Sequence, residues 1–160
     1  MEASRFLHSA GGLLTDPAAG PAIGVPWKNR RGKEEHAVGL MTYKEFDRFC
    51  GSLPAASKVV QWGGAHVWKV GGKVFAIGGW SEHDRPFVTF KCSPASFQML
   101  KDEPGLRPAP YLAARGGNWI QMHGEPGLGA ADLKAYITVS HGLVVRTLTR
   151  RLRKELGLPA

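Results

Sequence analysis

The chain has 160 residues, with 21 Lys or Arg against 13 Asp or Glu, and its formal net charge at pH 7 is +8. This length suits one ordinary domain with its own core, and the positive charge favours anionic partners such as nucleic acid or an acidic protein. No apolar run approaches the roughly 20 residues that cross a bilayer, and the first residues lack a secretory signal, so we expect a cytoplasmic protein.

Residues 1–40 differ in composition from the rest of the chain. They are rich in Gly, Ala and Pro, contain a mixed charge run at 28–35, and show no sustained periodicity. We expect them to form a disordered extension, followed by one domain over residues 41–160. Met41 is a second candidate for the start of translation, because a capping box from Thr42 to Glu45 follows it at once.

The first elements of the domain are predicted from local signals. A helix is expected from Tyr43 to Phe49, ending at Gly51, with Phe46 and Phe49 facing the core. Two strands, residues 65–70 and 73–77, flank Gly71-Gly72. Because glycine tolerates the positive φ of tight turns, this pattern predicts a β-hairpin.

A further strand and a helix are predicted between residues 87 and 105. Alternation from Phe87 to Cys92 indicates a half-buried strand that directs Lys91 away from the core. Ser93 suits an N-cap and Pro94 the first helical position, so a helix should run to about Glu103 and stop at Gly105.

The end of the chain should contain one more strand, residues 118–123, and a long helix over residues 130–156. One side of that helix carries an apolar stripe, and the other side gathers the basic residues Arg146, Arg150, Arg153 and Lys154. Together these elements predict an α+β fold in two layers. An antiparallel sheet of four to five strands packs against an N-terminal helix, a middle helix and the long C-terminal helix.

Three features in a fixed order resemble the MmcQ/YjbR family of small bacterial proteins, which are usually described as DNA-binding. They are the Lys-x-Ser-Pro step at 91–94, the Arg-Pro-x-Pro-Tyr-Leu turn at 107–112, and Trp119. The resemblance spans roughly residues 41–156. It implies an α+β fold related to that of frataxin-like and secretion-chaperone-like proteins, and it implies no reaction.

Two basic groups are candidates for contact with phosphate. The C-terminal basic side displaces counterions from nucleic acid in one interpretation, and is a solvated helix end in the other. Lys69 and Lys73 bracket the hairpin tip, where the family resemblance implies a wing-like element that contacts DNA. The neighbouring Trp68 is expected to pack in the core.

The turn from Arg107 to Trp119 is the third candidate. Pro108 and Pro110 stiffen it, so Tyr111 and Trp119 stack a base while Arg107, Arg115 and Lys91 bind phosphate in the functional interpretation. In the alternative, the turn is a clasp in which Tyr111 and Trp119 fill the rim of the core.

The sequence offers no catalytic, metal or cofactor site that we can assign. Its six histidines are scattered, and Cys50 and Cys92 stand far apart without a paired spacing, which favours buried thiols in a reducing compartment. We therefore predict a protein that is not an enzyme. It should bind DNA with weak sequence specificity through Lys69, Lys73, Lys91, Arg107, Arg115 and the C-terminal basic residues. The alternative is a protein-interaction module that uses the open face of the sheet or the basic residues to hold a partner.

Overall fold

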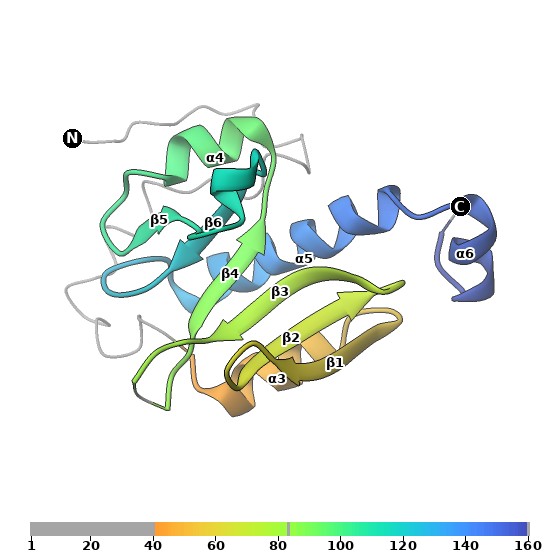
Figure 1. The fold of residues 1–160 in the computed structure, drawn as a ribbon, viewed down its shortest axis with the longest axis horizontal. Helices are drawn as coiled ribbons and strands as arrows, with labels where there is room; N and C mark the ends of the chain where they lie inside the picture. Colours follow the sequence, from red (N-terminus) through yellow and green to blue (C-terminus); the bar gives the residue numbers. More distant parts are fainter. Residues whose placement is uncertain (1–40, 83, 160) are drawn as a thin grey trace.

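A computed structural model describes residues 41–82 and 84–159, and the predicted disordered extension lies outside the described residues. These residues form an α+β fold in two layers (Figure 1). The helices are α3 (Tyr43–Gly51), α4 (Pro94–Leu100), α5 (Ala130–Arg146) and α6 (Arg150–Glu155), with a 3-10 turn η3 (Ala113–Arg115). The strands are β1 (Ala56–Gln61), β2 (Ala65–Val70), β3 (Lys73–Gly79), β4 (Phe87–Lys91), β5 (Leu106–Pro108) and β6 (Trp119–Met122).

The strands form one sheet in the order β1-β2-β3-β4-β6-β5, and every neighbouring pair is antiparallel. The two-layer α+β prediction is confirmed, with six strands where four or five were expected. The strands missing from the prediction are β1 and β5, at the two edges of the sheet. β5 contains Pro108, which an edge strand tolerates because its outer N–H groups need no partner in the sheet.

Local capping signals give the helix starts that were predicted. Thr42 accepts a hydrogen bond from the backbone N–H of Glu45 and donates its own N–H to the Glu45 carboxylate, which completes the capping box of α3. Ser93 caps α4 by accepting a hydrogen bond from the backbone N–H of Ser96, although α4 ends at Leu100 instead of running to Glu103.

The long C-terminal helix is broken, which corrects the prediction of one helix over residues 130–156. The Thr147 hydroxyl donates to the backbone carbonyl of Val144 and ends α5, while Thr149 caps the separate helix α6 through the N–H of Leu152. Between them Leu148 is buried against the hairpin, where a Cβ on Gly71 would lie 2.7 Å from its Cδ1 atom. The apolar spacing continues through the break, so periodicity did not reveal it.

The core lies between the sheet and the helices, with α3 and α5 on the same face (Figure 1). Phe46 of α3 and Tyr136 of α5 are fully buried, and Tyr136 stacks on Phe90 of β4 with ring centroids 5.4 Å apart. Trp68 is buried as predicted, and its indole N–H donates to Asp47 Oδ1 at 2.9 Å. Within the described residues, no helix has the length and apolar character needed to span a membrane.

One glycine shows how closely α3 lies on the sheet. A Cβ at Gly78 would stand 2.6 Å from Phe46 Cε2, so we expect Gly78→Ala to displace α3 and lower the free energy of unfolding by about 1 to 3 kcal/mol. A Cβ at Gly142 in α5 would meet no atom within 4 Å, so Gly142→Ala is the matched control and should stabilise by about 0.5 to 1 kcal/mol. Urea unfolding of both variants measures the difference. Equal stabilities would contradict the close packing.

Candidate functional site

The face of the sheet opposite α3 and α5, called the open face below, carries a row of side chains that crosses all six strands. From β1 to β5, the paired residues are Val59, Val67, Ile77, Thr89, Gln121 and Arg107. The half of the row on β1 to β3 is apolar, and the half on β4 to β5 is polar and ends in a cation. Val67, Ile77, Thr89 and Gln121 in the middle of the row are buried, whereas Val59 and Arg107 at its two ends are exposed.

A loop after β5 covers part of the apolar half. Leu112 packs against the buried cluster that contains Val67 and Ile77. Tyr111, by contrast, is 82% exposed, so the clasp interpretation is wrong for this residue. Trp119 is only partly buried, and β6 places it on the open face beside Lys91. Leu112 is thus the residue that anchors the turn.

The polar half is organised around Arg107. Its Nε donates to Gln121 Oε1 at 2.8 Å, and its guanidinium carbon lies 6.0 Å from the centre of the Phe87 ring. Phe87 meets His123 edge to face. Burial, followed by the charge of Arg107, lowers the pKa of His123 below its ordinary value.

The charged strand residues of the open face are all cationic. They are Lys69 on β2, Lys91 on β4 and Arg107 on β5. None of the six strands contains Asp or Glu, and Asp47 on the covered face is already bonded to Lys58 and His66. Lys91 is fixed through its backbone N–H, which donates to the buried Ser140 hydroxyl of α5 at 2.9 Å. The strand residues of this face therefore carry three positive charges and no negative charge.

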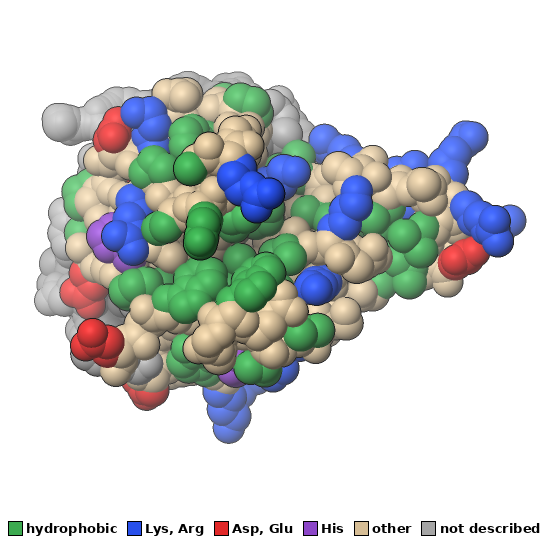
Figure 2. Space-filling view, viewed as in Figure 1, with side chains coloured by type: hydrophobic (Ala, Val, Ile, Leu, Met, Phe, Trp, Pro, Cys, Tyr) green, Lys and Arg blue, Asp and Glu red, His purple; other side chains and the backbone are tan. Residues whose placement is uncertain are grey.

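The remaining predicted site residues gather elsewhere, except for Arg115, which is exposed on η3 shortly after Leu112. Lys73 at the hairpin tip donates to the Thr147 hydroxyl at 3.2 Å, which brings the hairpin against the end of α5. The corner group defined by this contact consists of Lys73, Arg146, Arg150, Arg153 and Lys154. Eight of the nine predicted residues thus form two groups, with Arg115 in neither, and the β2–β3 hairpin carries a member of each. Figure 2 shows basic side chains from the open face out to the end of the molecule that bears α6, with the visible acidic side chains at the rim.

Two exposed tryptophans on the loops were not predicted from the sequence. Trp62 is 52% exposed in the β1–β2 turn, and Trp80 is 45% exposed after β3. Both have positive φ, 54° and 68°, as does Tyr111 at 75°. A bulky residue in this left-handed region costs on the order of 1 to 3 kcal/mol. No local sequence signal marked these residues, because their exposure depends on how the loops lie beside the assembled sheet.

The buried cysteines offer no nucleophile. Burial raises the pKa of Cys92 to about 12, and it raises the pKa of Cys50 further above its usual range. Among the described residues, no three His, Cys, Asp or Glu side chains lie close enough to hold a metal ion.

We expect both thiols of the folded protein to resist a disulfide reagent such as DTNB at pH 8, because very little thiolate exists at that pH. In denaturant both should react at once. Absorbance of the released thionitrobenzoate measures the two rates. Fast reaction of one equivalent in the native protein would contradict the burial of that cysteine.

The charge of Arg107 should affect the measured pKa of His123. We expect Arg107→Gln to raise the pKa of His123, measured by NMR titration of the imidazole, because one of the two effects that lower it is removed. With the folded pKa below the unfolded one, the neutral imidazole stabilises the fold above the unfolded pKa, and this contribution is lost as pH falls through the folded pKa. An unchanged pKa in the variant would show that Arg107 does not act on this ring.

Comparison with known proteins places this fold in a family. The YjbR family model matches residues 51–143, from the end of α3 through most of α5. The crystal structure of Deinococcus radiodurans protein DR2400, a DUF419 domain, is similar with a TM-score of 0.64 and 22% identity. That similarity covers 75% of this chain and 91% of the other, and it shows a shared fold. The comparison with curated proteins finds no match. Because the family model matches more than half of the chain, this protein belongs to the YjbR family.

Proposed function

We propose that this protein binds DNA mainly through the phosphates and does not catalyse a reaction. The observation that carries the proposal is the absence of acidic residues from all six strands, beside Lys69, Lys91 and Arg107 on the open face. Lysine and arginine side chains displace the counterions that condense on DNA, and this displacement is favourable when no carboxylate neutralises them first. The description of MmcQ/YjbR relatives as DNA-binding supports the same choice.

The corner group supports weak sequence specificity. Its arginines lie at the end of α5 and on α6, a helix of six residues, and Arg146, Arg150 and Lys154 are exposed. Exposed cations at a helix end contact phosphates readily, but phosphate contacts position a protein without reading bases. We therefore infer binding that depends on charge and salt more than on sequence.

A specific observation favours a second candidate function, protein binding at the edge of the sheet. β1 is an edge strand, and two consecutive residues within it, Val59 and Val60, are 40% and 58% exposed. Unpaired backbone groups beside exposed valines can accept a strand from another chain. A defined oligomer or a stoichiometric protein partner in size-exclusion chromatography, without nucleic acid in the eluate, would favour this candidate.

The salt dependence of DNA binding tests the first proposal. We expect the affinity for a random duplex to fall by about a thousandfold or more between 50 and 200 mM salt, as several phosphate contacts require. Replacing Lys69, Lys91 and Arg107 by Gln should reduce the slope of log K against log salt by about 0.9 for each phosphate that is no longer neutralised. Fluorescence anisotropy with a labelled duplex measures both.

Lys44→Gln is the matched control, because Lys44 is exposed on α3, which covers the opposite face of the sheet. Its slope should equal that of the wild type. Absence of binding at 50 mM salt, or binding that salt does not weaken, would reject the proposal.

A further inference from the structure

Three of the most exposed aromatic side chains in the described part of the chain have the backbone conformation that such residues adopt least readily. Trp62, Trp80 and Tyr111 all have positive φ, and only Ala55 shares this among the other described residues that are not glycine. Glycine would adopt the same conformation without strain. Tyr111 is 82% exposed and buries little area, and Trp62 and Trp80 remain about half exposed, so all three positions leave ring surface that a ligand can contact.

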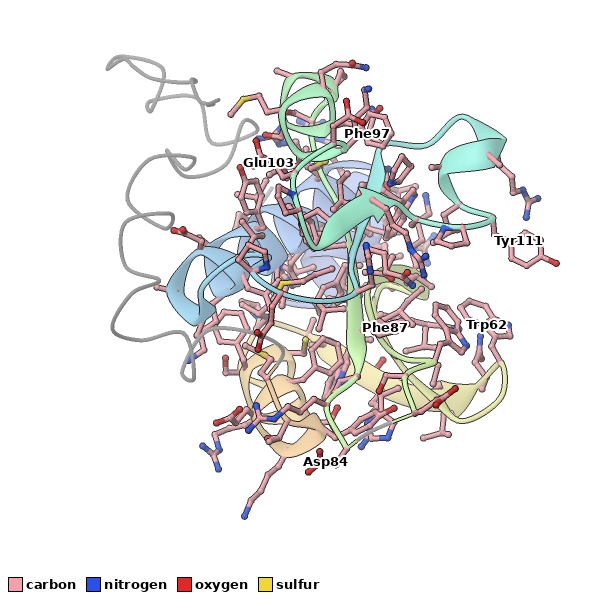
Figure 3. The ribbon with its side chains drawn as sticks, turned by 90° about the vertical axis from the view of Figure 1, so that its left-hand side faces the viewer. Trp62, Asp84, Phe87, Phe97, Glu103 and Tyr111 are labelled. Atoms are coloured by element: carbon pink, nitrogen blue, oxygen red, sulfur yellow. The ribbon has the colours of Figure 1, made fainter. Side chains whose placement is uncertain are left out.

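The aromatic side chains are held in place by their surroundings. The Trp80 indole N–H donates to the backbone carbonyl of Trp62 at 2.9 Å, which ties the β1–β2 turn to the loop after β3. Tyr111 stands between Pro110, which restricts the backbone, and Leu112, which packs on the open face. Figure 3 shows Trp62 and Tyr111 projecting on the same side of the molecule, with Phe87 set back toward the interior. Trp62 and Tyr111 are therefore presented on one side of the molecule, and the hydrogen bond to Trp62 keeps the Trp80 ring beside the β1–β2 turn.

The charges around these rings narrow the choice of ligand. Lys69, Lys91 and Arg107 require an anionic partner, and the exposed rings require a partner with accessible planar faces. The bases of a duplex are stacked on one another and offer no free face in the middle of the helix. An acidic peptide satisfies the cations but supplies few planar groups. Unpaired DNA supplies both.

We propose that the open face binds single-stranded DNA, with Trp62, Trp80 and Tyr111 stacking on unpaired bases while Lys69, Lys91 and Arg107 contact the phosphates. This inference rests on the proposed function, which supplies the contact with DNA. It adds that the bound DNA is single-stranded. Stacking is tolerant of sequence, because every base has a π face, so weak specificity is retained.

The test compares a labelled single strand of about 20 nucleotides, free of self-pairing, with its duplex at one salt concentration. We expect tighter binding of the single strand. Trp62→Gly and Tyr111→Gly should each weaken single-strand binding roughly five- to 150-fold, the range for removal of one stacked base, and leave duplex binding nearly unchanged. The melting temperature of Tyr111→Gly should stay close to that of the wild type, because this ring is 82% exposed and glycine relieves the backbone strain.

Ala55→Gly is the matched control, since it makes the same backbone change at a positive φ without removing a ring. It should bind single strands as the wild type does. Equal or tighter binding of the duplex, with both glycine variants unaffected, would overturn this inference and leave the proposed function standing. No binding to either DNA at 50 mM salt would reject both. Competition by polyglutamate as strong as that by single-stranded DNA would also overturn it, because stacking would then contribute nothing.

Discussion

The described helices cover only one face of a wide sheet, and the rest of the structure depends on this constraint. Six strands about 4.8 Å apart span about 24 Å. Two or three helices of about 10 Å diameter are enough to cover one face of a sheet of that width. α3, α4 and α5 all contribute to the same core, and Ser140 of α5 fastens that layer by donating to the carbonyl of Phe75 and accepting from the N–H of Lys91. Among the described residues no helix remains for the open face, where Leu112 is the residue after β5 that joins the buried cluster.

Because the helices lie on one face of the sheet, the charged side chains of the two faces have different partners. On the covered face, Asp47 binds Lys58, His66 and Trp68, so the acidic group of α3 is used to join a helix to β1 and β2. The open face has no corresponding helix in the described part of the chain and no acidic strand residue, and its cations keep their positive field. The cations on the strands of the open face are therefore not used to join a described helix to the sheet, as Lys58 is through Asp47 on the covered face.

Signals confined to a few neighbouring residues were predictable from the sequence. The Thr42 and Ser93 caps, the Gly71-Gly72 turn and the alternation in β4 each depend on local geometry, and each was confirmed. The break between α5 and α6 was not predictable, because Leu148 keeps the apolar period while its contact with Gly71 joins residues far apart in the chain. Thr89 illustrates the same limit: alternation placed it on the outer face, yet it is 1% exposed. Likewise, exposure of Trp62 and Tyr111 is a property of the assembled sheet, and no local pattern states it.

The two cationic groups divide the proposed binding energy between different parts of the molecule. From Arg107 on β5 to Lys69 on β2 is a path of four strand spacings, about 19 Å. Each strand of duplex DNA carries one phosphate per about 3.4 Å of helix axis, so this path would meet roughly five or six phosphates of a duplex strand but offers three strand cations. The open face is therefore undercharged for a duplex, and the aromatic rings supply a second, uncharged source of affinity for unpaired bases there. The corner group contains only cations and no aromatic ring. Its contribution to affinity would therefore depend on salt. Because Lys73 and Thr147 join the hairpin to that corner, a strand leaving the open face past Lys69 would meet the corner group next.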